Sequence, residues 1–167
     1  MRPNERIVQA NGVGLCIEAF GDPADPAILL ISGATASMDW WEDEFCERLA
    51  AGPRFVVRYD NRDSGRSVAY EPGEPLYTGS DLVADAVGLL DTLGLARVHL
   101  VGISMGGGIA QHVALDHADR VASLTLISTT PSVRADPAAP TCRRCPTSCA
   151  PSSPTRRPSP TGQTGRR

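Results

Sequence analysis

The sequence predicts an α/β protein built on an open, mostly parallel β-sheet, and three features of the chain support this fold class. Short apolar runs alternate with stretches of helical spacing, which is typical of strands joined by right-handed helical crossovers. The run at 27–31 is continuously apolar, as expected of a parallel strand covered on both faces. A G-x-S-x-G motif directly follows another apolar run, at 98–101, and directly precedes a helical pattern.

The strands follow from the apolar runs and from the turn residues between them. Two short strands surround the Asn11-Gly12 turn, which predicts a hairpin-like opening of the chain. Gly and Pro residues within 21–26 then mark a loop before the first parallel strand. In chain order, strands are expected at 6–10, 14–20, 27–31, 54–59, 98–101 and 121–127.

Helical spacing predicts three helices between these strands. In the first, Trp41, Phe45 and Leu49 lie on one side, and acidic residues gather near the start, where the helix dipole favours them. The second is expected to begin at a Ser80 N-cap and to stop at Gly94. The helices are expected at 39–50, between Ser80 and Gly94, and at about 107–117.

The G-x-S-x-G motif consists of Gly102, Ser104 and Gly106 at the junction of a strand and a helix. In this context the motif forms a nucleophile elbow, a tight turn in which the serine backbone is strained and the hydroxyl stands clear of the sheet. Larger side chains at the two glycine positions would collide with the turn. We predict that Ser104 is a covalent nucleophile; the alternative is a glycine-rich turn that serves only the backbone.

The composition changes sharply near residue 135. All 19 acidic residues lie at or before Asp136, whereas the stretch from Thr141 onward carries six arginines and no acidic residue. That stretch also contains no Val, Ile, Leu, Met, Phe, Tyr or Trp, so it cannot bury enough apolar surface to offset the entropy of ordering. We expect a folded portion over 1–135 and a disordered Arg/Pro/Ser/Thr/Cys-rich tail over 136–167, which a frameshift in a GC-rich coding sequence would explain.

No long apolar segment is present. The N-terminal residues 1–6 are not followed by the apolar region of a secretory signal, and no run approaches the roughly 18 apolar residues of a membrane span. Cys16 and Cys46 lie in a strand and a helix pattern and are expected to be buried as small apolar residues. A protein of the cytoplasm, without a membrane partner, is therefore expected.

Three further patterns are weak indications of ligand binding. Cys142, Cys145 and Cys149 have metal-like spacing, but a fourth ligand and a partner hairpin are missing nearby. The arginines beside them lack the aromatic residues of a nucleic-acid-binding segment. The glycine run 106–108 lacks the lysine of a phosphate-binding loop, since the sequence contains no lysine. We expect no metal, no cofactor and no nucleic-acid partner.

Four stretches within about residues 5 to 130 resemble the first half of an α/β-hydrolase fold protein. They are Phe20–Ala27, Arg58–Ser67, Val101–Gly106 and Ala114–His117. Within that superfamily the chain is most similar to aclacinomycin methylesterase-like esterases, which tailor polyketides. The resemblance implies that residues 1–135 form the N-terminal part of the domain, an incomplete sheet of about six strands, with the lid and most of the acyl pocket lying downstream.

The resemblance also implies a function. It indicates a serine hydrolase that cleaves a carboxylic ester, such as the methyl ester of a polyketide or another small hydrophobic molecule, through an acyl-enzyme on Ser104. The backbone N–H groups of Met105 and Ala34 would bind the oxyanion of the tetrahedral intermediate. Many relatives carry His-Gly where this chain has Ser32-Gly33, a change that a backbone donor tolerates. Serine at the elbow argues against haloalkane dehalogenase or epoxide hydrolase chemistry, because resembling proteins of those classes carry Asp there.

The remaining triad residues are not evident in the sequence. In this fold the acid and the histidine follow the serine in chain order. His99 lies in a strand pattern and is expected to be packed or hydrogen-bonded, and His112 and His117 lie on the helix leading away from Ser104. Asp136 is a candidate acid only by analogy with lipases that place theirs after the sixth strand. We therefore expect the triad acid and base to be absent and this polypeptide to be inactive.

Two other hypotheses for function stay open. A cofactor-free perhydrolase would use the same triad with peroxide in place of water. A truncated fragment would be inactive or would only bind a partner, and its segment 124–127 would form an exposed apolar edge that aggregates unless a partner chain covers it. The polar loop 60–67 is expected to be structural, with internal Arg–Asp pairing, and substrate contact is the alternative. The sequence does not predict the oligomeric state.

Overall fold

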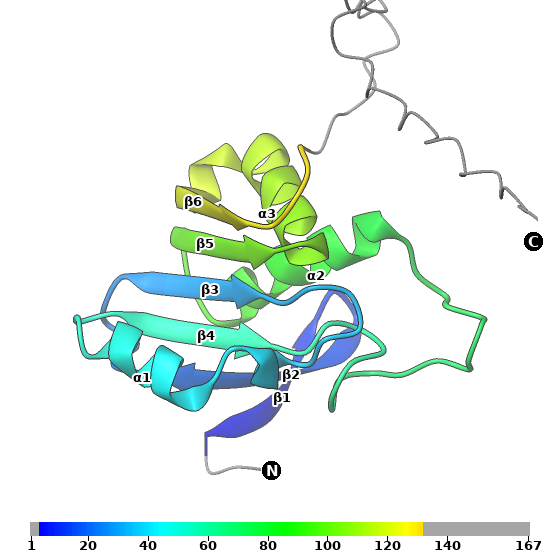
Figure 1. The fold of residues 1–167 in the computed structure, drawn as a ribbon, viewed down its shortest axis with the longest axis horizontal. Coiled ribbons are helices and arrows are strands. Elements are labelled where there is room, and N and C mark those ends of the chain that lie inside the picture. Colours follow the sequence, from blue (N-terminus) through cyan, green and yellow to red (C-terminus); the bar gives the residue numbers. More distant parts are fainter. Residues whose placement is uncertain (1–3, 132–167) are drawn as a thin grey trace, which may run out of the picture. The chain divides into compact units, whose positions relative to one another are not determined.

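The computed structural model of the protein describes residues 4–131, which form a six-stranded sheet with helices on both faces (Figure 1). The strand order is β1-β2-β4-β3-β5-β6. β1 and β2 are antiparallel, as are β2 and β4, and the other three neighbouring pairs are parallel. The strands are β1 (Glu5–Ala10), β2 (Val13–Phe20), β3 (Ala27–Ile31), β4 (Phe55–Tyr59), β5 (Val98–Ile103) and β6 (Val121–Ile127). The predicted α/β class with a mostly parallel sheet is confirmed.

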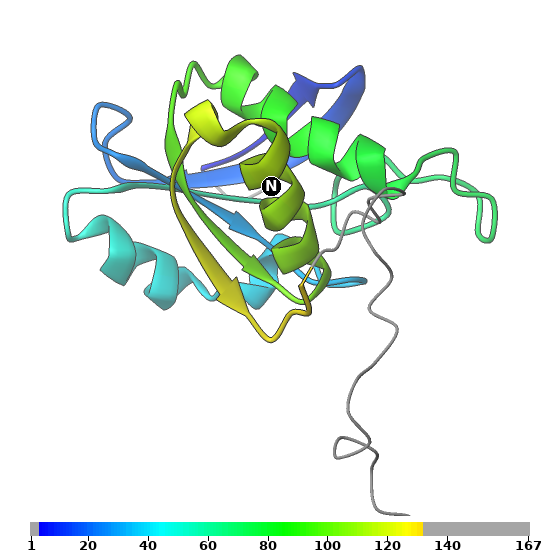
Figure 2. The same cartoon turned by 90° about the horizontal axis from the view of Figure 1, so that it is seen from above.

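Three α-helices and two short 3₁₀ turns connect these strands. They are η1 (Met38–Trp40), α1 (Asp43–Ala50), α2 (Gly79–Thr92), α3 (Met105–Asp116) and η2 (Ala118–Arg120). α2 and α3 cover one face of the sheet and α1 lies on the other, as the view from above shows (Figure 2). No helix within residues 4–131 is long and apolar enough to cross a bilayer.

The continuously apolar β3 lies at the centre of the core because successive side chains of a strand point to opposite faces. Leu29 and Ile31 pack in the cluster beneath α2 and α3. Ile28 and Leu30 pack in a second cluster with Trp41 and other residues on the α1 side. Burial on both faces is the reason that this strand shows no polar alternation.

The parallel strands β3, β4 and β5 run in the same direction and end at the same edge of the sheet. β6 is parallel to β5 and ends there too. The loops that leave these four strands therefore meet at one edge, where ligands bind in open α/β sheets. This edge carries the motif serine and its neighbours.

Three helix starts differ from the sequence-based expectation, and α3 begins at Met105, two residues before the expected start at about 107. The helix expected over 39–50 divides into η1 and α1, because the Ser37 hydroxyl accepts the Asp39 N–H at 3.3 Å and Trp41 then takes an extended conformation and is buried. α2 begins at an N-cap on Thr78, not on Ser80, because the side chains of Thr78 and Asp81 form a reciprocal capping box. These hydrogen bonds lower the pKa of the Asp81 carboxyl.

Other local predictions are confirmed. Gly94 follows the end of α2 with φ +67°, the left-handed conformation that stops a helix. Cys16 and Cys46 are buried free cysteines. The expected tail at 136–167, with Cys142, Cys145, Cys149 and Asp136, lies outside the described residues.

Candidate active site

Ser104 occupies the turn between the last residue of β5 and the first residue of α3. Its backbone has φ 51° and ψ −117°, a conformation that is strained for a residue with a side chain. The residue is exposed to solvent, although its two chain neighbours are partly covered. The strand–turn–helix geometry and the strained serine backbone agree with the elbow predicted from the motif.

The two motif glycines are required by the close approach of other backbone atoms. A Cβ atom built on Gly102 would lie 2.3 Å from the carbonyl oxygen of Gly106. A Cβ built on Gly106 would lie 2.2 Å from the carbonyl oxygen of Ile31, at the end of β3. Because real Cβ atoms do not approach backbone oxygen so closely, only glycine fits at either position. The steric prediction for both glycines is confirmed.

The loop that follows β3 approaches Ser104. A Cβ built on Gly33 would lie 3.6 Å from the Cβ of Ser104, which is ordinary van der Waals contact. Ala34, the next residue of this loop, is exposed. Met105 is the first residue of α3, so its N–H has no acceptor within the helix. The assignment of the Ala34 and Met105 N–H groups as oxyanion donors stays a prediction.

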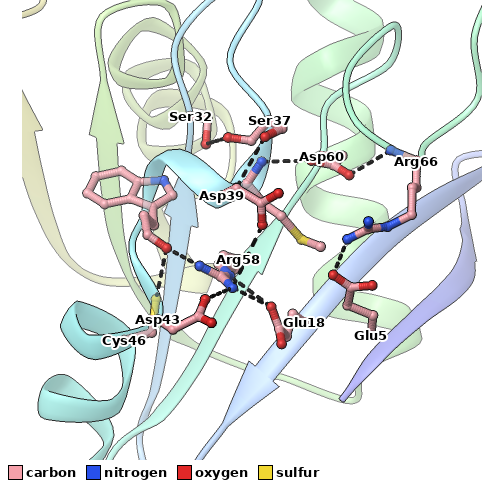
Figure 3. Close-up of polar contacts among 12 residues, drawn as sticks. Glu5, Glu18, Ser32, Ser37, Asp39, Asp43, Cys46, Arg58, Asp60 and Arg66 are labelled. Carbon is pink, nitrogen blue, oxygen red and sulfur yellow. Dashed lines mark hydrogen bonds and ion pairs between the residues drawn. The ribbon is translucent and has the colours of Figure 1, made fainter. Parts of the chain in front are cut away.

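Residues at the end of β4 hold the loop that faces Ser104 in place, a role that no motif in the sequence predicts. The buried Asp60 carboxylate accepts the Met38 N–H at 2.7 Å, just beyond the loop, and the Arg66 N–H at 2.8 Å. The Asn61 side chain donates to the Ser32 carbonyl at 3.5 Å. Asp60 thereby joins the loops after β3 and β4, as Figure 3 shows for its contacts.

Gly65 and Ser67 both contact Asp60 within the loop 60–67. Gly65 has φ +50°, and a Cβ there would lie 2.0 Å from an Asp60 carboxylate oxygen. The Ser67 hydroxyl donates to the Asp60 carbonyl at 2.6 Å and accepts the Cys16 N–H of β2 at 2.9 Å. This loop is therefore anchored to the sheet, in agreement with the predicted structural role.

The arginines of the loop pair with acids outside it, so the expected internal Arg–Asp pairing is wrong. Arg62 forms an ion pair with Asp85 of α2 at 2.7 Å, and this hydrogen-bonded pairing raises the arginine pKa. Arg66 pairs with Glu5 of β1. The fold places the Asp85 carboxylate of α2 and the Glu5 carboxylate of β1 within ion-pair distance of these two guanidinium groups.

A buried arginine, Arg58 of β4, organises polar contacts that reach α1 (Figure 3). The side chain of Arg58 is fully buried and pairs with Glu18 of β2 and Asp43 of α1. It also donates to the Trp41 carbonyl, which the Cys46 thiol contacts at 3.7 Å. Burial raises the pKa of the Cys46 thiol to about 11, so this cysteine is protonated at neutral pH.

The histidines lie on elements of the sheet and of α3. The His99 ring contacts the Ser123 hydroxyl on the adjacent strand β6 through Nδ1, at 2.7 Å, which confirms its predicted hydrogen-bonded role. His112 lies within α3, and His117 is the C-cap of that helix, at the end opposite Ser104. Within residues 4–131, no three His, Cys, Asp or Glu side chains gather into a set that could hold a metal ion.

The fold and the Ser104 turn match one protein family. A family model described as alpha/beta hydrolase fold matches residues 26–143. The chain belongs to the α/β hydrolase fold family. The match includes β3, the Asp60 loop, the Ser104 turn and β6. The superfamily resemblance expected from the sequence motifs is thereby confirmed.

Relatives within the α/β hydrolase fold family include esterases. Rhodomycin D methylesterase DauP from Streptomyces sp. (strain C5) is 43% identical over 122 residues, which cover 73% of this chain and 41% of that protein. The putative carbamate hydrolase RutD from Caulobacter vibrioides is 38% identical over 117 residues, or 69% of this chain and 42% of that protein. The chain thus spans about two fifths of the length of these curated relatives.

A solved structure in the same family has a similar backbone. Epoxide hydrolase A from Mycobacterium thermoresistibile superimposes with a TM-score of 0.67 at 32% sequence identity, over 73% of this chain and 38% of that chain. Esterases and an epoxide hydrolase therefore share this half of the fold, so the family assignment alone does not decide the bond that is cleaved.

Proposed function

We propose that this chain carries the nucleophile of a serine ester hydrolase and that Ser104 is that nucleophile. The observation that carries the proposal is the strained, exposed backbone of Ser104 at the β5–α3 junction, beside the Gly33 loop. A strained turn that only reversed the chain would not need to expose a hydroxyl at the carboxyl edge of the parallel strands. Strain of this kind commonly marks a site of chemistry.

The proposed reaction proceeds through an acyl-enzyme. The Ser104 hydroxyl gives its proton to a general base while its oxygen attacks the ester carbonyl, whose π electrons move onto the carbonyl oxygen. The N–H groups of Met105 and Ala34 would hold this oxyanion, and loss of one such donor typically costs about 10²–10³ in rate. Collapse of the intermediate expels the alcohol, and water then releases the carboxylic acid and regenerates the serine.

The substrate class follows from the relatives and from the elbow residue. A rhodomycin D methylesterase is among the relatives, so we propose a methyl ester of a polyketide or of another small hydrophobic molecule as substrate. Serine at position 104 favours ester cleavage over epoxide opening, because the epoxide hydrolases that this chain resembles carry Asp at the elbow. Cytoplasmic location stays a prediction from the sequence.

No candidate for the general base is evident in this chain. The sequence holds three histidines, the last at His117, and none follows β6, where chain order in this fold places the base. We therefore propose that this 167-residue chain by itself is inactive as an ester hydrolase. Attack by the serine and release of the acyl group both need a base, so ester hydrolysis is slow without one. A fluorophosphonate is a stronger electrophile than an ester, and water can accept the serine proton during this slower reaction.

A fluorophosphonate tests the nucleophile without requiring turnover. The full chain is incubated with the probe, and intact mass with peptide mapping locates the adduct. We expect one phosphonyl group on Ser104, none in Ser104→Ala, and normal labelling in the matched control Ser80→Ala, another exposed serine at a helix start. Labelling elsewhere, or equal labelling of Ser104→Ala, would contradict the proposal.

A further inference from the structure

The segment that follows β6 folds back over the first turn of α3. Ser128 has φ 45°, a left-handed conformation that turns the chain at the end of the strand. The Thr129 hydroxyl then donates a hydrogen bond to the carbonyl oxygen of Ser104 at 2.8 Å. We propose that Thr129 is a positioning residue that orients the peptide between Ser104 and Met105; its catalytic consequence rests on the proposed function of Ser104.

The reason lies in the geometry of a single peptide group. The carbonyl of Ser104 and the N–H of Met105 belong to the same planar unit, and in a trans peptide they point in opposite directions. A hydrogen bond that fixes the direction of the carbonyl therefore also fixes the direction of the N–H. Through this peptide unit, Thr129 fixes the direction of the Met105 N–H, which is the proposed oxyanion donor.

The backbone on both sides of Ser104 is held by the end of β6. The Ser104 N–H donates to the Ile127 carbonyl at 3.0 Å. The Ser104 carbonyl accepts from Thr129 at 2.8 Å and, on its other lone pair, from the Gly108 N–H of α3 at 3.1 Å. The serine is thus clamped at both of its peptide groups, which explains how its strained conformation is maintained.

The two hydrogen bonds to the Ser104 carbonyl also polarise the peptide. Each draws electron density toward the oxygen, and chains of hydrogen bonds strengthen one another in this way. The Met105 N–H has no acceptor in the helix, so its enhanced donor strength is available to a ligand. A substrate oxyanion at Ser104 would gain from this polarisation.

Residues of α3 contact the segment that contains Thr129. A Cβ built on Gly107 would lie 2.7 Å from both Cβ and Cγ2 of Thr129, so glycine leaves the space that the threonine fills. One turn further, the Gln111 side chain donates to the Thr130 carbonyl at 3.0 Å. The Thr129 hydroxyl has a longer alternative acceptor, the Thr130 carbonyl at 3.4 Å, and the shorter contact with Ser104 is the stronger one.

Three substitutions in the full chain separate the hydroxyl from the shape of the side chain. Thr129→Val keeps the branched shape and removes the donor. Thr129→Ser keeps the donor and removes the methyl group that fills the space over Gly107. Thr130→Val is the matched control, because it makes the same change one residue along, where the contact with Gln111 is made by the backbone carbonyl. If Thr129→Val does not fold, Thr129→Ala takes its place.

Two measurements are made on each variant, the rate of fluorophosphonate labelling of Ser104 and the amide resonance of Met105 in the unlabelled chain. We expect Thr129→Val to label about tenfold more slowly, less than the ~10²–10³-fold loss for a deleted oxyanion donor. Its Met105 amide proton should move upfield. Thr129→Ser should restore both readings toward wild type, and Thr130→Val should change neither.

The outcomes distinguish this proposal from the proposed function. If wild type labels faster than Ser104→Ala while Thr129→Val matches wild type, the nucleophile stands and the role of Thr129 is overturned. Slower labelling with an unmoved Met105 resonance also overturns it, because the loss would then come from stability alone. If wild type labels no faster than Ser104→Ala, the proposed function fails, and the Met105 resonance alone decides whether Thr129 orients the peptide.

Discussion

Ser104 has a backbone conformation of high energy, and the residues packed around it prevent a change to another conformation. Positive φ in a residue with a side chain costs about 1–3 kcal/mol and persists only where the surroundings determine it. Here the surroundings are the carbonyl groups packed against Gly102 and Gly106, and the Ile127 carbonyl and Thr129 hydroxyl bonded to the serine backbone. The strain is therefore maintained by packing that the rest of the sheet supplies.

Gly106→Ala tests this packing directly. The new methyl group would lie 2.2 Å from the Ile31 carbonyl oxygen and 2.5 Å from that of Ser32, so α3 must move away from β3. We expect a loss of about 1–3 kcal/mol in the free energy of unfolding, as for other overpacked sites, together with loss of Ser104 labelling. Urea unfolding followed by circular dichroism measures the first quantity.

The matched control is Gly79→Ala, the same substitution at the first residue of α2. A Cβ at Gly79 has no heavy atom within 4 Å and the glycine has no positive φ, so this change should be neutral or stabilising by up to ~1 kcal/mol. Equal effects of the two substitutions would show that the close contact at Gly106 does not constrain the turn.

The sequence predicts the structural roles of some site residues and not of others. Ser104 and its two glycines form a local motif with a known steric requirement, so their arrangement could be predicted. The roles of Asp60 and Thr129 could not, because each depends on a contact more than 20 residues away in the chain, to Met38 and Ser104 respectively. Only the folded sheet brings these partners together.

At the scale of elements, periodicity predicts the strands well and the helix starts less well. The strands β3 and β6 have the bounds expected. For β3 the reason is that a strand buried on both faces of a sheet must be apolar over its length. Helix starts depend on side-chain hydrogen bonds between a few neighbouring residues. Thr78 and Ser80 are both residue types that favour an N-cap. The helix begins after Thr78 because the Asp81 carboxylate, three residues on, completes a capping box with it.

β6 is an edge strand among the described residues, as the sequence predicted. Leu124 and Leu126 are 38% and 43% exposed, and the span Val121–Ile127 carries no charged residue that would oppose pairing with another chain. We expect Leu126→Lys to reduce self-association of the chain, measured by sedimentation velocity over a range of protein concentrations.

Leu76→Lys is the control for this change at the edge. Leu76 is 79% exposed and lies in the loop before α2, so its substitution alters net charge and exposed apolar area in the same direction without touching the sheet edge. If both variants reduced association equally, general surface hydrophobicity would be responsible and the strand edge would not.

At the scale of the whole molecule, the site exists because parallel strands end together. The loops after β3 and β4, the Ser104 turn after β5 and the Thr129 segment after β6 come from separate parts of the chain and meet at one edge of the sheet. The strand alternation in the sequence predicts such an edge. It does not predict which polar groups bridge the loops, since register and loop path are set by packing across the sheet.

Proteins with differently named activities share the portion of the fold that this chain contains. The matched relatives include proteins named as a methylesterase, a carbamate hydrolase and an epoxide hydrolase, and this chain spans about two fifths of their lengths. The common portion holds the elbow and the loop that faces it. We infer that the residue at the elbow and the groups beyond β6 decide which bond is cleaved.

A crystal structure of the fluorophosphonate adduct tests the central claim most directly. We expect the phosphorus to be bonded to Ser104 Oγ and the phosphoryl oxygen to lie about 2.7–3.1 Å from the N–H groups of both Met105 and Ala34. An adduct on another residue would contradict the account, and so would a phosphoryl oxygen turned to solvent with neither amide in reach.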